Sequence, residues 1–251
     1  MDGTEIVLAI IQARMSSARL PGKVMKVVNG KPIIQWQIQR MKQSKGISEI
    51  VVATSKDDSD DALAQFVEAE GVPVIRGSLN NVLARYITVL DLYPAKAFLR
   101  ITADCPLFMP EICDNMIRRF GEMGWEYLSN THPPTFPNGC DVEIVDTGVL
   151  RRLVSSRPTT VEQEHVTLGI YGRPGFAKCE NYLNERNDSR FRWTLDTSED
   201  LSFIMDVYAS FEGQESTFRY SDVMDLISSN TVSPVFEVRD DGPMSRSGHS
   251  R

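Results

Sequence analysis

The segment IIQARMSSARLPGKVM, residues 10–25, places cationic and hydroxyl side chains directly behind an apolar run. Arg14, Arg19 and Lys23 are charged donors that bind phosphate oxygens well. Gly22 allows the backbone to approach an anion closely. The phosphate-loop spacings G-x-x-x-x-G-K-[ST] and G-x-G-x-x-G are both absent from the segment. It therefore predicts an anion-binding loop of another kind, with an exposed basic turn as the alternative.

Two aspartates follow strand-like runs that lie far apart in the sequence. Asp104 comes after AKAFLRIT and just before a Cys-Pro pair, which keeps the following loop out of a helix. Asp196 comes directly after RWTL, and the next residues, with Asp200, form a helix-capping pattern. Asp104 and Asp196 could share one Mg²⁺ ion with a triphosphate. The alternative for Asp104 is a turn or cap, and capping is the favoured interpretation of Asp200.

A second group of polar residues could bind a hydroxylated molecule. Asp141 and Glu143 lie two residues apart in NGCDVEI, so on a strand they face the same side. Glu164 and His165 begin a helical turn in EQEHVTL. Together they could line an acceptor pocket. An acidic sheet edge and a surface histidine are equally good interpretations of the same residues.

Composition limits the classes of partner. The 251 residues carry 27 Lys and Arg against 34 Asp and Glu, a net charge of -7, which argues against a nucleic-acid binder. No apolar run approaches the roughly 20 residues that span a bilayer, and the N-terminus lacks the pattern of a secretory signal. The four cysteines show no C-x-x-C spacing, so we expect free thiols. The sequence predicts a cytoplasmic protein without nucleic-acid or membrane partners.

The elements that position these residues alternate between strand and helix. The predicted strands are 5–12, 49–54, 72–77 and 95–102, and the predicted helices are 32–41, 59–71, 80–93 and 110–123. Such alternation predicts an α/β fold with a mostly parallel, twisted sheet and helices on both faces. Ligands of open α/β sheets bind at the carboxyl ends of the strands, where the basic loop and both aspartates are expected.

The regular alternation stops at Asn130, where THPPTFPNG predicts a rigid loop. Beyond it we predict a strand at 140–146, helices at 148–156 and 161–172, a strand running into a helix over 192–211, and a last helix at 220–230 capped by Ser221. The chain is expected to form one domain, 1–232, with an excursion at 131–172 and a flexible tail at 233–251.

Six segments resemble the cytidylyltransferases of the spore-coat polysaccharide biosynthesis protein F type, relatives of the CMP-Kdo and CMP-sialic acid synthetases. In chain order they are IIQARMSSARLPGKVM, RGSLNNVLARY, RITADCPLF, FPNGCDVE, EHVT and RWTLDTSEDL. The resemblance implies a Rossmann-like, glycosyltransferase-A-like fold. It also implies an Mg²⁺-dependent enzyme that transfers CMP from CTP to a sugar or sugar-acid acceptor, releasing pyrophosphate, for cell-surface or spore-coat polysaccharide synthesis. A homodimer formed through the excursion is a further implication.

The resemblance also implies roles for individual residues. Lys23, Arg14, Asp104 and Asp196 are expected to be catalytic, the two aspartates as metal ligands. The nucleotide-binding set is Ala13, Arg14, Ser16, Arg19, Gly22, Lys23, Arg76, Gly77 and Thr102, and the acceptor-binding set is Asn130, Asp141, Glu143, Glu164 and His165. The general base stays open between a hydroxyl on the metal ion, Asp196, Glu143 and His165.

The sequence departs from the family pattern in two places. Asn80 and Asn81 stand where many relatives carry acidic residues, and Gln163 stands where an arginine usually precedes EHVT. The missing arginine weakens the case for a carboxylated or phosphorylated acceptor.

Two rival functions stay open. One is that of a glycosyltransferase, whose usual D-x-D metal motif is absent from residues 95–110. The other is a nucleotide-binding homologue that has lost catalysis.

Overall fold

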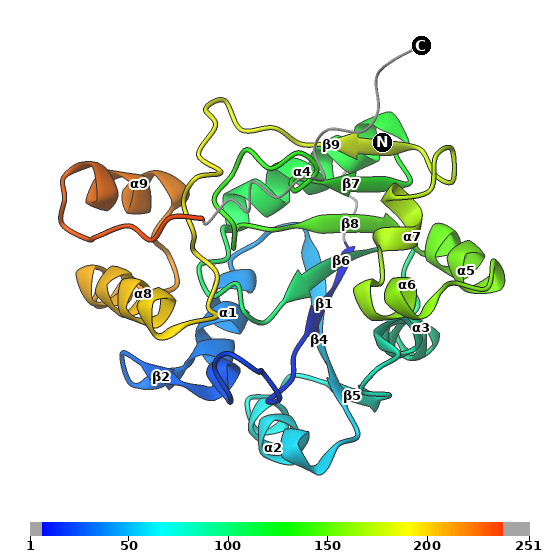
Figure 1. The fold of residues 1–251 in the computed structure, drawn as a ribbon, viewed down its shortest axis with the longest axis horizontal. Helices are drawn as coiled ribbons and strands as arrows, with labels where there is room; N and C mark the ends of the chain where they lie inside the picture. The colour runs from blue at the N-terminus through cyan, green and yellow to red at the C-terminus, as the bar shows by residue number, and fades with distance from the viewer. Residues whose placement is uncertain (1–6, 238–251) are drawn as a thin grey trace.

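The computed structural model describes residues 7–237, and one seven-stranded sheet forms its centre. The strands are β1 Val7–Gln12, β4 Ile47–Ser55, β5 Val74–Gly77, β6 Ala97–Thr102, β7 Tyr127–Ser129, β8 Glu143–Asp146 and β9 Cys179–Asn181. They lie in the order β5-β4-β1-β6-β8-β7-β9 (Figure 1). The first four of these run parallel, whereas β8 is antiparallel to both of its neighbours. The mostly parallel sheet predicted from the sequence is confirmed.

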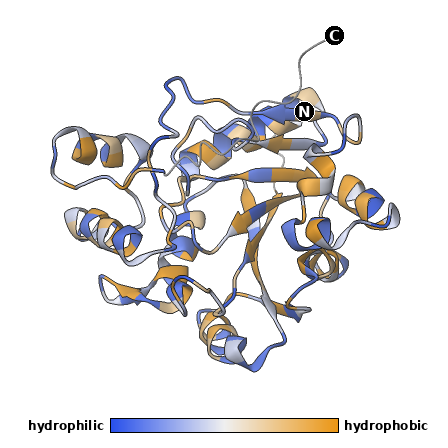
Figure 2. Ribbon diagram, in the orientation of Figure 1, coloured by the Kyte–Doolittle hydropathy of each residue, from blue (hydrophilic) through white to orange (hydrophobic). Residues whose placement is uncertain are grey.

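The central strand β1 is apolar on both sides because both faces of the sheet are covered. Ala9 and Ile11 belong to the core on one face, and Leu8 and Ile10 to the core on the other. Figure 2 shows the apolar strands at the centre, with hydrophilic residues on the outer sides of the helices. This double burial explains why the strand reads as a continuous apolar run rather than an alternating one.

Helices pack on both faces of the sheet, as expected for this fold class. On one face lie α1 Ile33–Met41, α2 Asp61–Ala69, α4 Pro110–Met123, α8 Ser198–Ser210 and α9 Tyr220–Ser228. On the other lie α3 Val82–Leu92, α5 Thr147–Ser155 and α7 Leu168–Tyr171, with α6 Thr160–His165 beside α3. Among the helices described, none has the length and apolar character needed to cross a membrane.

The structure breaks the single helix that the sequence predicts at 161–172. Val166 has φ 52 and ψ -62, and the Thr167 N–H donates to the His165 carbonyl at 2.5 Å. This geometry is that of the rare and strained γ-turn. It separates α6 from α7 and lies inside the EHVT segment. The sequence gives no periodicity signal for it, because the apolar residues on either side continue the helical pattern.

Residues 192–195, predicted as a strand, instead form an extended segment held by single contacts. Arg192 makes an isolated bridge with Asn138, and the Leu195 N–H donates to the Asp104 carbonyl at 2.8 Å. The last helix also differs from prediction, since Arg219 is its N-cap and Ser221 lies inside its first turn. Strand β9 and the short hairpin of β2 Val27–Val28 and β3 Lys31–Pro32 were not predicted from the sequence.

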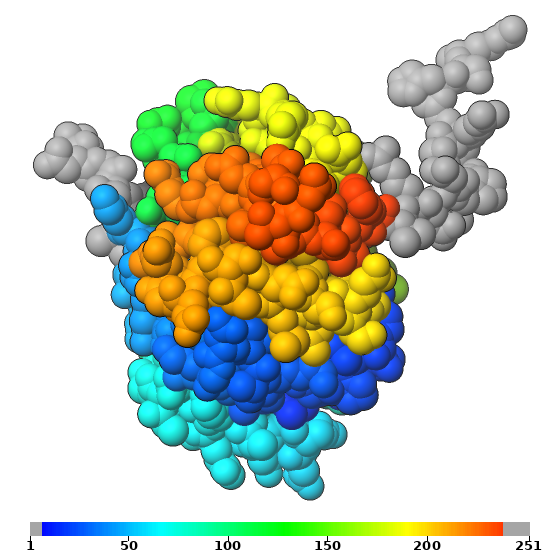
Figure 3. All heavy atoms as spheres, turned by 90° about the vertical axis from the view of Figure 1, so that its left-hand side faces the viewer, coloured from blue at the N-terminus to red at the C-terminus, as the bar shows by residue number. Residues whose placement is uncertain are grey.

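Strands from early and late parts of the chain lie side by side in the seven-stranded sheet. Strand β8 lies inside the segment predicted as an excursion, yet it joins the main sheet between β6 and β7. Late segments also cover early ones: the rings of Trp36 and Tyr208 lie 5.4 Å apart, and Figure 3 shows the orange segment against the blue one. Residues 233–237, assigned to the tail, pair along 190–192. The remainder of that tail lies outside the described residues.

Candidate active site

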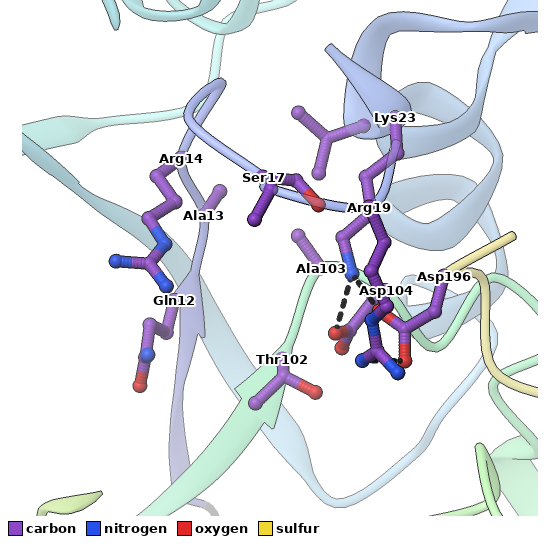
Figure 4. A pocket seen from close by; sticks show the side chains of 12 residues that line it. Gln12, Ala13, Arg14, Ser17, Arg19, Lys23, Thr102, Ala103, Asp104 and Asp196 are labelled. Atoms are coloured by element: carbon purple, nitrogen blue, oxygen red, sulfur yellow. Dashed lines mark hydrogen bonds and ion pairs between the residues drawn. The ribbon is translucent and has the colours of Figure 1, made fainter. Parts of the chain in front are cut away.

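A cavity of about 320 Å³ opens at the carboxyl ends of β1 and β6, where the fold predicts a ligand. It is lined by Gln12, Ala13, Arg14, Ser17, Ala18, Arg19, Lys23, Val24, Thr102, Ala103, Asp104 and Asp196. Figure 4 shows Arg14 and Gln12 on one side and the two aspartates, with Arg19 and Lys23, on the other. The basic loop and both predicted metal ligands therefore share one cavity.

The basic loop reaches this position through a turn that requires glycine. Gly22 has φ 68, a left-handed conformation that other residues adopt at a cost. Its N–H donates to the Met15 carbonyl at 3.0 Å, which closes the loop on itself. A short 3₁₀ helix, Lys23–Met25, begins at the next residue and directs the nearly buried Lys23 side chain inward. Gly22 thus shapes the loop without lining the cavity.

The ammonium group of Lys23 bridges the two carboxylates. Its Nζ lies 2.8 Å from Asp104 Oδ2 and 2.8 Å from Asp196 Oδ1. Arg19 Nη2 lies 2.7 Å from the other Asp196 oxygen, Oδ2. The dashed lines of Figure 4 mark these contacts. The structure therefore brings together the residues that the sequence analysis named as catalytic, apart from Arg14, which lines the opposite wall.

Asp196 is held from behind by the start of α8. The Asp200 carboxylate accepts hydrogen bonds from the N–H groups of Asp196 and Thr197, each at 2.8 Å, and completes a capping box with Thr197. This confirms the capping role predicted for Asp200. Arg192 adds a contact at 2.8 Å to Asp196 Oδ2 and one at 3.0 Å to Asp200 Oδ1. Arg192 was not predicted from the sequence as a site residue. Its role depends on how the chain folds back toward Asp196 and Asp200, which no local sequence pattern indicates.

The charges in this cluster stabilise one another. Burial alone would lower the pKa of Lys23, but the pairing with Asp104 and Asp196 raises it overall. Burial alone would raise the pKa of Asp196, but Lys23, Arg19 and Arg192 lower it overall. Both groups are therefore charged at neutral pH.

The two carboxylates suit a hard divalent cation. Both present an oxygen toward the same point, the Lys23 Nζ, and carboxylate oxygens are preferred ligands of Mg²⁺. Within residues 7–237, no three His, Cys, Asp or Glu side chains are grouped so as to hold a metal ion. An ion between Asp104 and Asp196 would thus need further oxygens from phosphate or water, as Mg²⁺ commonly does.

Several residues expected at the nucleotide lie outside the cavity lining. Arg76 donates to the carbonyls of Ser55 and Asp57 and pairs with Asp61 at 2.6 Å. Gly77 leaves room for a buried arginine, because a Cβ atom there would lie 2.5 Å from Arg85 Cγ. Ser16 is exposed, and the neighbouring Ser17 lines the cavity instead.

The residues expected to bind the acceptor fall into separate groups. Glu143, on β8, pairs with Arg100 of β6 at 2.5 Å and accepts a hydrogen bond from the Tyr127 hydroxyl. Arg100 lies two residues before Thr102, so both face the same side of the sheet. Glu143 therefore lies on the same face of the sheet as Thr102, but farther from the cavity.

Asp141 precedes β8 and Asn130 follows β7, and the two differ in their surroundings. Burial, with smaller contributions from Glu143 and Asp104, raises the pKa of Asp141 to about 7. Asn130 is buried, and its side-chain amide bonds the backbone of Cys140 and Val142. The structure thus gives Asn130 a backbone-holding role in place of the predicted acceptor contact.

Glu164 and His165 are exposed on α6, outside the cavity lining. The γ-turn at Val166 and then α7 follow these two residues. In α7, the ring centroid of Tyr171 lies 5.9 Å from that of Tyr127 and 4.0 Å from that of His132. This aromatic group adjoins the Arg100–Glu143 pair through Tyr127. Its members were not singled out from sequence, because aromatic residues in such positions are usually core.

Comparison with known proteins identifies the family. A family model described as Cytidylyltransferase matches residues 8–221, so the chain belongs to the cytidylyltransferase family of enzymes. Spore coat polysaccharide biosynthesis protein SpsF of Bacillus subtilis strain 168 is 32% identical over 234 residues, which cover 89% of this chain and 95% of that protein.

Other relatives support the same assignment. The 3-deoxy-manno-octulosonate cytidylyltransferase of Geobacter sulfurreducens is 33% identical over 118 residues, 46% of each protein. A cytidylyltransferase structure from Leptospira borgpetersenii has a TM-score of 0.84 and 32% identity, covering 90% of this chain and 94% of that chain. The structure of CMP:2-keto-3-deoxy-manno-octonic acid synthetase complexed with CTP has a TM-score of 0.62 at 18% identity, with 82% and 99% covered, and supports the fold.

Proposed function

We propose that this protein transfers CMP from CTP to a hydroxyl of a sugar or sugar acid, releasing pyrophosphate, for the synthesis of a cell-surface or spore-coat polysaccharide. The observation that carries the proposal is the convergence of Asp104 and Asp196 on one point inside a cavity walled by the basic loop. Family membership supports CTP as the nucleotide, and the names of the relatives support a sugar-like acceptor.

We assign different roles in the reaction to the residues that line the cavity. Arg14, Arg19 and Lys23 bind the triphosphate and neutralise charge on the leaving pyrophosphate, so their main contribution is electrostatic. Asp104 and Asp196 hold Mg²⁺, which when bound supplies charge neutralisation and alignment of phosphate oxygens. The acceptor oxygen attacks the α-phosphorus in line with the bond to the departing pyrophosphate, and its proton passes to a nearby base.

The surroundings of one base candidate, Asp196, make it a poor proton acceptor. Asp196 contacts three cationic side chains, which lower its pKa. A carboxylate held by cations gains little by taking up a proton. These contacts argue that the proton leaves by a route other than Asp196. Another candidate carboxylate, Glu143, is engaged by Arg100 and the Tyr127 hydroxyl.

The two departures from the family pattern lie away from the carboxylate pair. Asn81 caps α3 through a 2.9 Å hydrogen bond from the Ala84 N–H, and Gln163 donates to the Pro158 carbonyl. Both line a different cavity, between α3 and the α5–α6 connection. They therefore give no reason to infer that catalysis has been lost.

We propose that the protein forms a homodimer through the 131–172 segment, as in the family that the sequence resembles.

Ligand-dependent thermal stabilisation tests the nucleotide assignment and can identify the acceptor. With Mg²⁺ present, CTP should raise the melting temperature more than ATP, GTP or UTP, because only a bound ligand stabilises the folded state. A panel of neutral sugars and sugar acids is then screened in the presence of CTP. No shift with CTP would contradict the proposal.

A further inference from the structure

We propose that Lys23 closes the metal site in the nucleotide-free protein, so that a divalent ion binds together with CTP and not before it. The proposal rests on the proposed function, since it concerns the same two carboxylates. It adds an order of binding and names the side chain that enforces it.

The contacts of Lys23 place its charge where the ion would have to lie. Its Nζ is 2.8 Å from an oxygen of Asp104 and 2.8 Å from an oxygen of Asp196. An ion bound by both oxygens would have to approach the same point between them, since Mg²⁺ binds oxygen at about 2.1 Å. Two cations cannot share that space, so Lys23 must leave before the ion enters.

The remaining contacts of the pair reduce its attraction for a free cation. Arg19 Nη2 and Arg192 Nη2 lie 2.7 Å and 2.8 Å from Asp196 Oδ2. With Lys23, three positive charges thus face the two carboxylates. Only 11% of the Lys23 side chain surface is exposed, so water screens its contacts weakly. A divalent ion alone would have to displace a buried ammonium that gains no new partner.

A triphosphate changes this balance. The basic loop that carries Lys23 also carries Arg14 and Arg19, and all three line the same cavity. Phosphate oxygens in that cavity offer the ammonium an alternative set of acceptors. Lys23 can then exchange carboxylate partners for phosphate partners while the ion takes its place. Metal binding and nucleotide binding are coupled by one side chain.

Mn²⁺ binding in the absence of nucleotide tests the proposal, because free Mn²⁺ is measured directly by electron paramagnetic resonance. Lys23→Met should bind Mn²⁺ at least tenfold more tightly than the wild type when no CTP is present. Lys26→Met, which removes the same charge three residues away, should bind like the wild type. The double variant Lys23→Met with Asp104→Asn should lose the gain. Circular dichroism checks the fold, and Lys23→Gln serves if the Met variant does not fold.

The outcomes separate this inference from the proposed function. If the wild type is stabilised by CTP with Mg²⁺ but the Lys23 variants bind Mn²⁺ no more tightly than the wild type, the closure by Lys23 is overturned and the proposed function stands. If the Lys23 variants gain Mn²⁺ affinity while CTP stabilises none of the proteins, the closure stands and the nucleotide assignment fails.

Discussion

At the scale of single residues, the site depends on carboxylates that play different roles although they lie close together in sequence. Asp196 faces the cavity, whereas Asp200, four residues later, is 1% exposed and bonds the backbone at the start of α8. Asp104 reaches the same point from the end of β6. The sequence separates Asp196 from Asp200 correctly, because a capping pattern assigns one carboxylate and leaves the other free.

Substitution of these aspartates should separate activity from stability. Asp104→Asn and Asp196→Asn should each lower pyrophosphate release at least about 100-fold, because a lost metal ligand costs several kcal/mol in the transition state. Asp200→Asn should chiefly lower the free energy of unfolding, by about 1–3 kcal/mol, because a buried hydrogen-bonded carboxylate is weakened. Turnover assays and urea unfolding measure the two effects. Equal turnover in Asp196→Asn and the wild type would reject the metal assignment.

The raised pKa of Asp141 predicts a pH dependence of stability. Its pKa is about 7 in the folded protein, above the ordinary aspartate pKa of 3.8. Between these values the folded state binds more protons than the unfolded state, so the contribution of Asp141 to stability falls as pH rises. Without divalent ions, Asp141→Asn should therefore be more stable than the wild type at pH 8 by about 1–4 kcal/mol. At pH 4 the difference should largely vanish.

Urea unfolding at both pH values gives this comparison. A difference between Asp141→Asn and the wild type that stays constant from pH 4 to pH 8 would refute the assignment of the titration to Asp141. The same outcome would follow if a neighbouring carboxylate carried the shift.

At the scale of elements, the sequence predicts the parts whose pattern is local. The buried strands β1, β4 and β6 and the helices between them follow from apolar runs and helix periodicity. The break at Val166 does not, because the helical pattern continues on both sides of it. The extended segment before Asp196 does not, because it is held by contacts with the distant residues Asn138 and Asp104. For the same reason Arg192 and the Arg100–Glu143 pair were not foreseen, while the basic loop and both aspartates were.

Gly139 lies against Trp193 and Thr194 of the extended segment, which is distant from it in the sequence. It has φ 109, and a Cβ atom there would lie 2.5 Å from the Thr194 nitrogen and 2.5 Å from the Trp193 carbonyl carbon. Gly139→Ala should therefore lower the free energy of unfolding by about 2–5 kcal/mol, the sum of backbone strain and overpacking. It should also weaken CTP binding, because the 193–195 segment leads into Asp196.

The matched control for this prediction is Gly213→Ala. Gly213 also has a positive φ, 82, but a Cβ atom there meets nothing within 4 Å. Its cost should be only about 1–2 kcal/mol, the backbone term alone. Equal losses in the two variants, measured by urea unfolding, would show that the close approach at Gly139 contributes nothing.

At the scale of the whole molecule, a protein of net charge -7 concentrates cationic side chains around one cavity. Charge attraction should then make a large contribution to CTP binding. Raising the salt concentration from about 0.05 M to about 0.5 M shortens the Debye length severalfold and should weaken CTP binding by about tenfold. Calorimetry at the two salt concentrations checks this. An affinity unchanged by salt would argue against a triphosphate bound by the basic loop.

The most direct test of the central claim is pyrophosphate release with CTP, Mg²⁺ and the acceptor panel, together with mass detection of the CMP-linked product. We predict one pyrophosphate for each CMP-linked product with CTP, far less with ATP, GTP or UTP, and none above background in Asp104→Asn or Asp196→Asn. Turnover that persists in both aspartate variants, or that shows no preference for CTP, would contradict the account.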